Sequence, residues 1–320
     1  MHQMQTVAVL YLDGDDRKLW EASLDAVPDL LSITVDGNPA VSLEALRRKG
    51  GTIRVVIISA RLYPGAYPEL AKLVREACPG IELLLISPDD ASPPLKPLFA
   101  DDIRHLALNS EKGRPNREHL PSVISMLVDR RAWEIGACLK KGTKVHSYRL
   151  GSSEDKESMI GALEGVLAGA GEEMDMLRQK GALLADELLE NAMYNAPRGA
   201  HGDRLFKKGE KRDMLPQEHI IFSFGFDGET LALKLADNWG SLEPDLVLEY
   251  LAKNQEDGSG ADDAGGRGLF IIWRFLDQFH VNVEPGRRTV VGGHLQLGSR
   301  LDPDAPRGFH ITKHQKEIAT

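Results

Sequence analysis

The sequence predicts two domains, an α/β domain with a parallel sheet followed by an α+β domain. The chain has 320 residues, which is about two average domain lengths. Up to about residue 128, short apolar runs alternate with amphipathic stretches. Beyond residue 144, helices are grouped apart from strands that read as antiparallel, a pattern typical of an α+β domain.

The first half contains five short apolar runs with helix-like segments between them. Runs that are apolar at nearly every position are typical of strands buried on both faces of a parallel sheet. Five such units predict a flavodoxin-like, doubly wound domain over residues 1–128. The runs are 6–12, 31–35, 52–59, 81–87 and 103–109, and the helix-like segments include 17–26, 42–49, 67–78 and 118–128.

The second half follows a predicted connecting helix at 129–143 and extends over 144–300. Asp227-Gly228 is a turn signal that joins two antiparallel strands. The polar residues 301–320 are expected to form a loosely held C-terminal tail. The predicted order is a strand at 144–150, helices at 153–170 and 172–196, strands at 219–226 and 230–236, helices at 246–253 and 268–278, and a hairpin at 280–297.

Composition excludes several classes of protein. Lys and Arg number 39 against 48 Asp and Glu, a net charge of −9, which argues against direct binding of nucleic acid. No apolar run is long enough to cross a bilayer, and the N-terminus does not resemble a signal peptide. Two cysteines are too few for a disulfide framework or a Cys-based zinc site. We therefore expect a cytoplasmic protein with no membrane partner.

Three separated segments of the second half carry residues that could take part in catalysis or ligand binding. Glu187 and Asn191 are four apart on a predicted helix, so a carboxylate and a carboxamide share one face and suit a base and a magnesium ligand. Asp237 ends a predicted strand, where a buried carboxylate can accept from an amino group such as that of adenine. The glycines of 265–268 open a helix, where backbone amides can approach an anion. Taken singly, these segments also fit an exposed polar helix face, a turn and a flexible connection.

The order and spacing of the three segments resemble the nucleotide-binding site of the GHKL ATPase superfamily. Within it, the sequence ELLENAMYNAP is similar to the Glu-x-x-x-Asn helix of the anti-sigma factor serine/threonine kinases, and GGRGLFIIWRFLD is similar to their second glycine box. The resemblance covers roughly residues 143–298. It implies a GHKL (Bergerat) α/β sandwich that binds ATP and Mg²⁺.

The resemblance also implies a role for each matching residue. Glu187 would polarise the attacking hydroxyl or water, and Asn191 would bind magnesium. Asp237 would read adenine. Residues 255–265 would form a lid over the nucleotide. The glycines that would border the nucleotide are Gly240, Gly265, Gly266 and Gly268.

Two positions depart from the pattern of that family. Trp239 occupies a usual glycine position in the first glycine box, which reads Asp-Asn-Trp-Gly-Ser here. Asn195 stands where the family has His. A histidine kinase is disfavoured, because neither His119 nor His146 lies in a phosphoacceptor motif. Residues 197–217 form a basic insertion, for which a solvated loop is favoured over contact with an acidic partner or with phosphates.

The first half resembles a response-regulator receiver domain that has lost its chemistry. An acidic group, Asp13, Asp15 and Asp16, follows the first strand. However, the third strand ends with Ser59 or Ala60 at the position where a receiver has its phosphoacceptor Asp. Asn109 stands near the position of the receiver's lysine. The resemblance therefore implies a pseudo-receiver used for binding.

Three functions follow from these interpretations. The first is an ATP-dependent serine/threonine kinase that phosphorylates an antagonist protein in an anti-sigma-type partner-switching pathway. The second is a non-catalytic module whose binding of a signalling partner is gated by nucleotide. The third is a scaffold in which both domains are degenerate. A homodimer is compatible with each of them.

Overall fold

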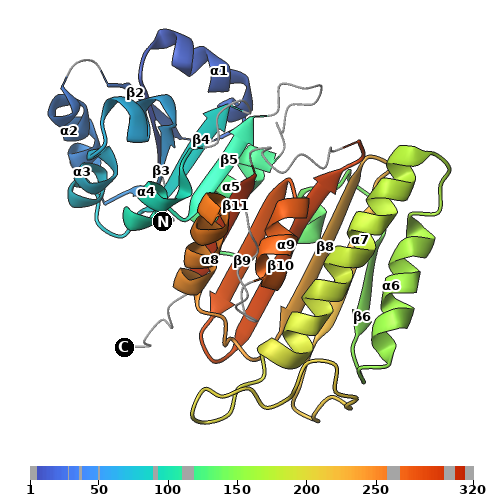
Figure 1. The fold of residues 1–320 in the computed structure, drawn as a ribbon. Helices are drawn as coiled ribbons and strands as arrows, with labels where there is room; N and C mark the ends of the chain where they lie inside the picture. Colours follow the sequence, from blue (N-terminus) through green and yellow to red (C-terminus); the bar gives the residue numbers. More distant parts are fainter. Residues whose placement is uncertain are drawn as a thin grey trace, which may run out of the picture. The chain divides into compact units, whose positions relative to one another are not determined.

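A computed structural model describes residues 6–27, 29–35, 38–49, 51–88, 93–109, 119–257, 267–298 and 307–313. The chain divides into two compact units, Met1–Arg131 and Ala132–Thr320 (Figure 1). The division falls inside the boundary region, 128–143, that the sequence predicts. The protein is of mixed α/β type, with parallel and antiparallel strand pairs.

The first unit is built on a parallel sheet of strand order β2-β1-β3-β4-β5. Each of the five predicted apolar runs overlaps one of its strands. The central strands β1 and β3 are almost fully buried, as expected for strands with neighbours on both sides. The strands are β1 (Thr6–Tyr11), β2 (Leu30–Thr34), β3 (Ile53–Ser59), β4 (Glu82–Pro88) and β5 (His105–Asn109).

Helices connect these strands, and α1 packs against α5 while α2 packs against α3. The short α4 was not predicted from the sequence, because six residues that include Pro97 carry too little periodicity to indicate a helix. A short irregular segment, Arg61–Ala66, follows β3. The helices are α1 (Gly14–Leu24), α2 (Pro39–Lys49), α3 (Leu70–Ala77), α4 (Leu95–Ala100) and α5 (His119–Val128).

The second unit contains strands in the order β11-β9-β10-β8-β7-β6. Neighbouring strands from β9 to β6 are antiparallel, whereas β11 lies parallel to β9. The strands are β6 (Val145–Arg149), β7 (Ile221–Phe226), β8 (Thr230–Asp237), β9 (Gln278–Glu284), β10 (Arg288–Gln296) and β11 (Gly308–Lys313).

One face of this sheet is covered by helices (Figure 1). They are α6 (Asp155–Val166), α7 (Glu172–Glu190), α8 (Pro244–Asp257) and α9 (Arg267–Phe275). Gly181 allows α7 to approach the sheet, since a Cβ there would lie 3.0 Å from Leu231 of β8 and 3.3 Å from Leu163 of α6. Because side chains alternate along a strand, Leu235 and Asp237 share the face of Leu231. The register of β8 thus directs Asp237 toward the helices.

Two predicted segments differ in the structure. The expected connecting helix, 129–143, contains only a 3₁₀ turn, Ile135–Ala137. Its apolar residues instead pack on the sheet face opposite the helices, where Trp133 stacks on His280 with ring centroids 4.6 Å apart. The prediction of a loose tail is wrong for residues 308–313, which form β11. Phe309 and Ile311 are fully buried there, a pattern too short to stand out in a polar segment.

Candidate functional site

The second unit brings together the end of α7 and the start of α9. Glu187 lies in the last turn of α7, and Asn191 follows directly after α7 on the same face. Gly268 lies in the first turn of α9. A Cβ on Gly268 would lie 2.6 Å from Glu187 Oε2 and 3.1 Å from Asn191 Nδ2. A glycine therefore lets the second glycine-rich segment approach both polar side chains without displacing the carboxylate.

The helix changes geometry at Asn191. Asn191–Asn195 form a π-helical turn, η3, closed by a hydrogen bond of 2.9 Å from Ala196 N to Asn191 O. Asn195 Nδ2 donates to Asn191 Oδ1 over 2.6 Å, whereas the buried Asn191 Nδ2 has no hydrogen-bond partner among the described residues. Such turns are frequent at functional sites. The turn also corrects the prediction of one regular helix over 172–196.

Asp237 ends β8 with only 5% of its surface exposed. Its carboxylate accepts from Trp239 N over 2.9 Å and from Gly240 N, and Thr289 stands opposite it in the register of β10. Burial raises the pKa of Asp237 to about 6, although the backbone hydrogen bonds act in the opposite direction. A buried carboxylate that borders a cavity is suited to accepting from a donor group on a ligand.

Gly240 has a structural role of its own. It adopts a φ of 58°, in the left-handed region that favours glycine, and a Cβ there would overlap Glu284 O and Arg287 N. Gly286 N donates to Gly240 O over 3.0 Å, which ties the segment to the β9–β10 turn. Ser241 Oγ donates to Ala196 O over 2.6 Å, which ties it to the end of η3. Gly240 therefore positions the segment after Asp237.

A cavity of about 150 Å³ lies between these elements. It contains both Asn191 and Asp237. Its walls are mostly apolar, with a few polar groups, which is the usual construction of a small-molecule site. The lining residues are Leu188, Asn191, Ala192, Asn195, Ala196, Arg198, Arg204, Leu235, Asp237, Ser241, Leu242, Glu243, Leu246, Tyr250, Leu269, Thr289 and Val291.

Some of the predicted site residues line the cavity, some lie next to it, and others are outside the described residues. Asn191 and Asp237 line the cavity, while Glu187 and Gly268 lie next to Asn191. Gly265 and Gly266 lie outside the described residues. Of the predicted lid, 255–265, residues 255–257 belong to the end of α8, and residues 258–265 lie outside the described residues.

Sequence reasoning did not find several lining residues. Thr289 could have been found only from the register of the β9–β10 hairpin, because nothing in its local sequence marks it. Ser241 and Glu243 were hidden because they follow the unusual glycine box. Arg198 and Arg204 belong to the basic insertion, for which the solvated-loop interpretation was favoured.

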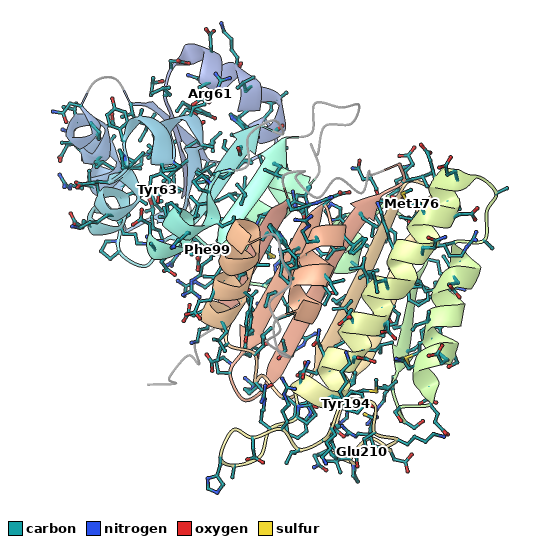
Figure 2. All side chains as sticks on the ribbon, in the orientation of Figure 1. Arg61, Tyr63, Phe99, Met176, Tyr194 and Glu210 are labelled. Carbon is teal, nitrogen blue, oxygen red and sulfur yellow. The ribbon has the colours of Figure 1, made fainter. Side chains whose placement is uncertain are left out.

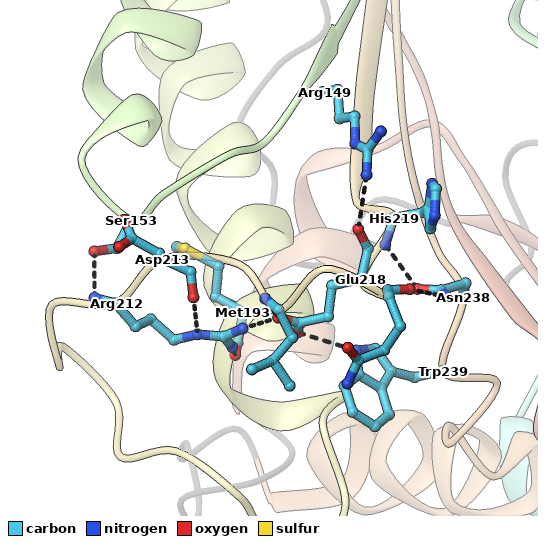
Figure 3. Close-up of polar contacts among 11 residues, drawn as sticks. Arg149, Ser153, Met193, Arg212, Asp213, Glu218, His219, Asn238 and Trp239 are labelled. Carbon is cyan, nitrogen blue, oxygen red and sulfur yellow. Dashed lines mark hydrogen bonds and ion pairs between the residues drawn. The ribbon is translucent and has the colours of Figure 1, made fainter.

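Trp239 does not line the cavity; its indole Nε1 donates to Glu218 Oε1 over 3.2 Å (Figure 3). Glu218 is fully buried, and its other oxygen pairs with the Arg212 guanidinium and accepts from Leu215 N over 2.5 Å. Arg212 in turn donates to Met193 O over 2.7 Å. The bulky residue of the glycine box is therefore accommodated by a buried polar network.

That network anchors the insertion, residues 197–217, which we term the inserted arm. Besides Arg212, Tyr194 Oη of η3 donates to Glu210 O over 2.7 Å (Figure 2). Lys208 Nζ lies 2.6 Å from Glu190 Oε2 of α7. The arm is thus tethered to the same helix that carries Glu187 and Asn191, although most of its residues are exposed, as the sequence predicts for a solvated loop.

In the first unit, the predicted acidic group is used structurally. The side chain of Asp13 caps α1 by accepting from Asp16 N over 2.8 Å, and Asp15 pairs with Lys18 at 3.0 Å. Asp16 is fully buried and accepts from Ser59 Oγ over 2.7 Å and from Leu12 N over 2.9 Å. Ser59, at the end of β3, is therefore committed to holding Asp16.

The raised pKa of Asp237 predicts a pH dependence of stability. An unfolded Asp has a pKa near 4, so between about pH 4 and about pH 6 the folded chain binds the proton more tightly than the unfolded chain does. The contribution of this carboxyl to the free energy of unfolding should fall as pH rises through that window, by at most about 3 kcal/mol. The measurement is denaturant unfolding of the ligand-free protein at pH 4.5 and pH 7. Asp237→Asn, in which the other titrating groups are unchanged, should lack this component, and an identical pH profile would contradict the prediction.

Comparisons with known proteins assign no family to the chain. No protein-family model matches the chain, and no curated protein matches it. Among solved structures, one similar chain is a pilus assembly-related protein from Burkholderia pseudomallei, with a TM-score of 0.32 and 13% identity over 42% of this chain and 96% of that one. Another is a glucosamine N-acetyltransferase region of a fungal multi-domain β-N-acetylglucosaminidase, with a TM-score of 0.27 and 10% identity over 73% of this chain and 25% of that one. At these TM-scores neither similarity bears on function.

Within the described part of the chain, no helix has the length and apolarity that crossing a membrane requires.

Proposed function

We propose that the second unit binds an adenine nucleotide in the cavity between α7, β8 and α9. The observation that carries the proposal is the buried Asp237 carboxylate at one wall of a cavity that Asn191 also lines. Apolar walls such as Leu235 and Val291 suit the faces of a purine ring, and the carboxylate suits its exocyclic amine. This arrangement supports the resemblance to the GHKL ATPases that the sequence motifs indicate.

The reaction that fits the site is transfer of the γ-phosphoryl group of ATP. Bound Mg²⁺ would neutralise the charge of the phosphates, and Asn191 fits as a ligand because Asn195 occupies only one acceptor position of Asn191 Oδ1. Glu187 would accept the proton of the attacking hydroxyl. Asp237 would bind the adenine ring and so orient the phosphate chain of the nucleotide. Positioning and charge neutralisation of this kind supply most of the catalysis in phosphoryl transfer.

The motifs of the anti-sigma factor kinases suggest the acceptor. We propose that the hydroxyl belongs to a serine or threonine of an antagonist protein in a cytoplasmic partner-switching pathway. The first unit, with the strand order of a doubly wound domain and with Ser59 committed to Asp16, would act as a pseudo-receiver that binds a signalling partner. A homodimer is compatible with this scheme.

A second function is favoured by one specific contact. The Trp239–Glu218–Arg212 network joins the segment after Asp237 to the inserted arm. A nucleotide that contacts Asp237 would thereby act on the position of the arm, so the unit would serve as a nucleotide-gated binding module without phosphoryl transfer.

The test combines binding with transfer. The full chain is titrated with ATP with and without Mg²⁺, and is then incubated with radiolabelled ATP and candidate antagonist proteins. A kinase labels a partner on Ser or Thr, and Glu187→Gln should retain binding but abolish the label. Binding without any label under all partners would favour the gated module. If millimolar ATP neither binds nor shifts the melting temperature, the nucleotide assignment is wrong.

A further inference from the structure

The inserted arm begins with a tight hairpin that carries two arginines. Gly199 N donates to Asp203 O over 2.8 Å, and Leu205 N donates to Pro197 O over 3.2 Å. Arg198 and Arg204 form an antiparallel bridge and are therefore directly opposite one another. Directly opposed residues of antiparallel strands project to the same side, and both arginines line the cavity.

Among the described residues, no carboxylate neutralises the two guanidinium groups. Arg198 Nη1 donates to the backbone carbonyl of Gly202 over 3.3 Å. Neither Arg198 nor Arg204 makes an ion pair with a carboxylate among the described residues. Like charges placed directly opposite one another are destabilising, so an anion bound between the two arginines would relieve the repulsion. By contrast, three other cations of the arm each pair with a glutamate, namely Lys208, Lys211 and Arg212.

The position of the hairpin is fixed independently of any ligand. The segment before it is η3, which carries Asn191 and Asn195, and Ser241 donates to Ala196 O at its base. The distal part of the arm is held by the buried Arg212–Glu218 pair. The arginines are therefore presented to the cavity on an anchored support, which lowers the entropic cost of binding.

We infer that Arg198 and Arg204 form a clamp for the phosphate chain of the ligand, which gives the cavity a preference for polyphosphorylated nucleotides over the nucleoside. The inference rests on the proposed nucleotide site, with Asp237 at the base and the clamp at the anionic end. Arg is suited to this task because its guanidinium binds phosphate oxygens in a bidentate manner. The clamp supplies fixed positive charge in addition to the metal held by Asn191.

The test measures binding of ATP, adenosine and inorganic tripolyphosphate to the full chain and to Arg198→Gln, Arg204→Gln and the double variant. Lys207→Gln is the matched control, since Lys207 is an exposed cation of the same arm that does not line the cavity. Each arginine variant should weaken ATP binding about tenfold, because a hydrogen bond to a charged group contributes about 1.5 kcal/mol or more. Adenosine binding should be unchanged, and Lys207→Gln should match the wild type for all three ligands. The melting temperature of the ligand-free double variant should equal or exceed that of the wild type.

The possible outcomes show whether the clamp, the nucleotide site or both are wrong. If ATP binds the wild type and the double variant equally, or if adenosine binding falls in parallel with ATP binding, the clamp is overturned while the nucleotide site stands. If the wild type binds tripolyphosphate through the two arginines but no nucleotide, the clamp stands and the nucleotide site fails. If neither ligand binds, both are overturned.

Discussion

Replacement of Asp237 by asparagine is expected to weaken ATP binding by about 30- to 100-fold, equivalent to about 2–3 kcal/mol. The substitution keeps the size of the side chain and an acceptor for Trp239 N. However, it turns one carboxylate oxygen into an amide donor that faces the amino group of adenine. Two donors would then oppose each other at a position that is only 5% exposed, where water cannot compensate. The measurement is isothermal titration of the full chain with ATP and Mg²⁺.

Two comparisons make this prediction specific. Asp25→Asn removes an exposed carboxylate of the first unit and should leave ATP affinity unchanged. GTP presents a carbonyl where ATP presents its amine, so the amide of Asp237→Asn should reduce the discrimination between the two nucleotides. Equal ATP affinity in Asp237→Asn and the wild type would rule out the assigned role of Asp237.

Replacement of Glu218 by alanine should destabilise the second unit by about 3–5 kcal/mol. The side chain of Glu218 is 0% exposed and that of Arg212 is 5% exposed, so removing the carboxylate leaves a buried guanidinium without its counter-charge. The indole N–H of Trp239 and the amide of Leu215 also lose their acceptor. Because the chain has two units, the loss is best measured as hydrogen exchange of the β7 and β8 amides, with peptides of the first unit as an internal reference.

The control is the Lys211–Glu154 pair of the same arm, which is exposed to solvent. Lys211→Ala should leave exchange in β7 and β8 unchanged, since exposed pairs contribute little. Combining Glu218→Leu with Arg212→Met should recover part of the lost protection, because an apolar replacement of both partners leaves no unpaired buried charge. Unchanged protection in Glu218→Ala would show that the network does not anchor the arm.

The elements that were predicted well are those whose pattern is local. Each apolar run of the first half overlaps a strand, since a strand buried on both faces is apolar at nearly every position. That Glu187 and Asn191 share a face could also be predicted locally, because residues four apart on a helix lie on the same side. The segment 129–143 misled the prediction because its apolar residues, such as Trp133, are buried by the sheet without helix formation.

By itself, the sequence predicted every strand of the described residues except β11, most of the helices, and the candidate site residues Glu187, Asn191, Asp237 and Gly268. Local spacing and residue type carry that information. Only the tertiary structure decided that Gly268 packs against Glu187 and that Trp239 contacts Glu218 and not the cavity. It also decided that Arg198 and Arg204 line the same cavity as Asp237. These contacts depend on strand register and on buried charge pairs between segments far apart in the chain. Such interactions leave no periodic pattern in the residues around them, so the fold alone determines which polar groups meet.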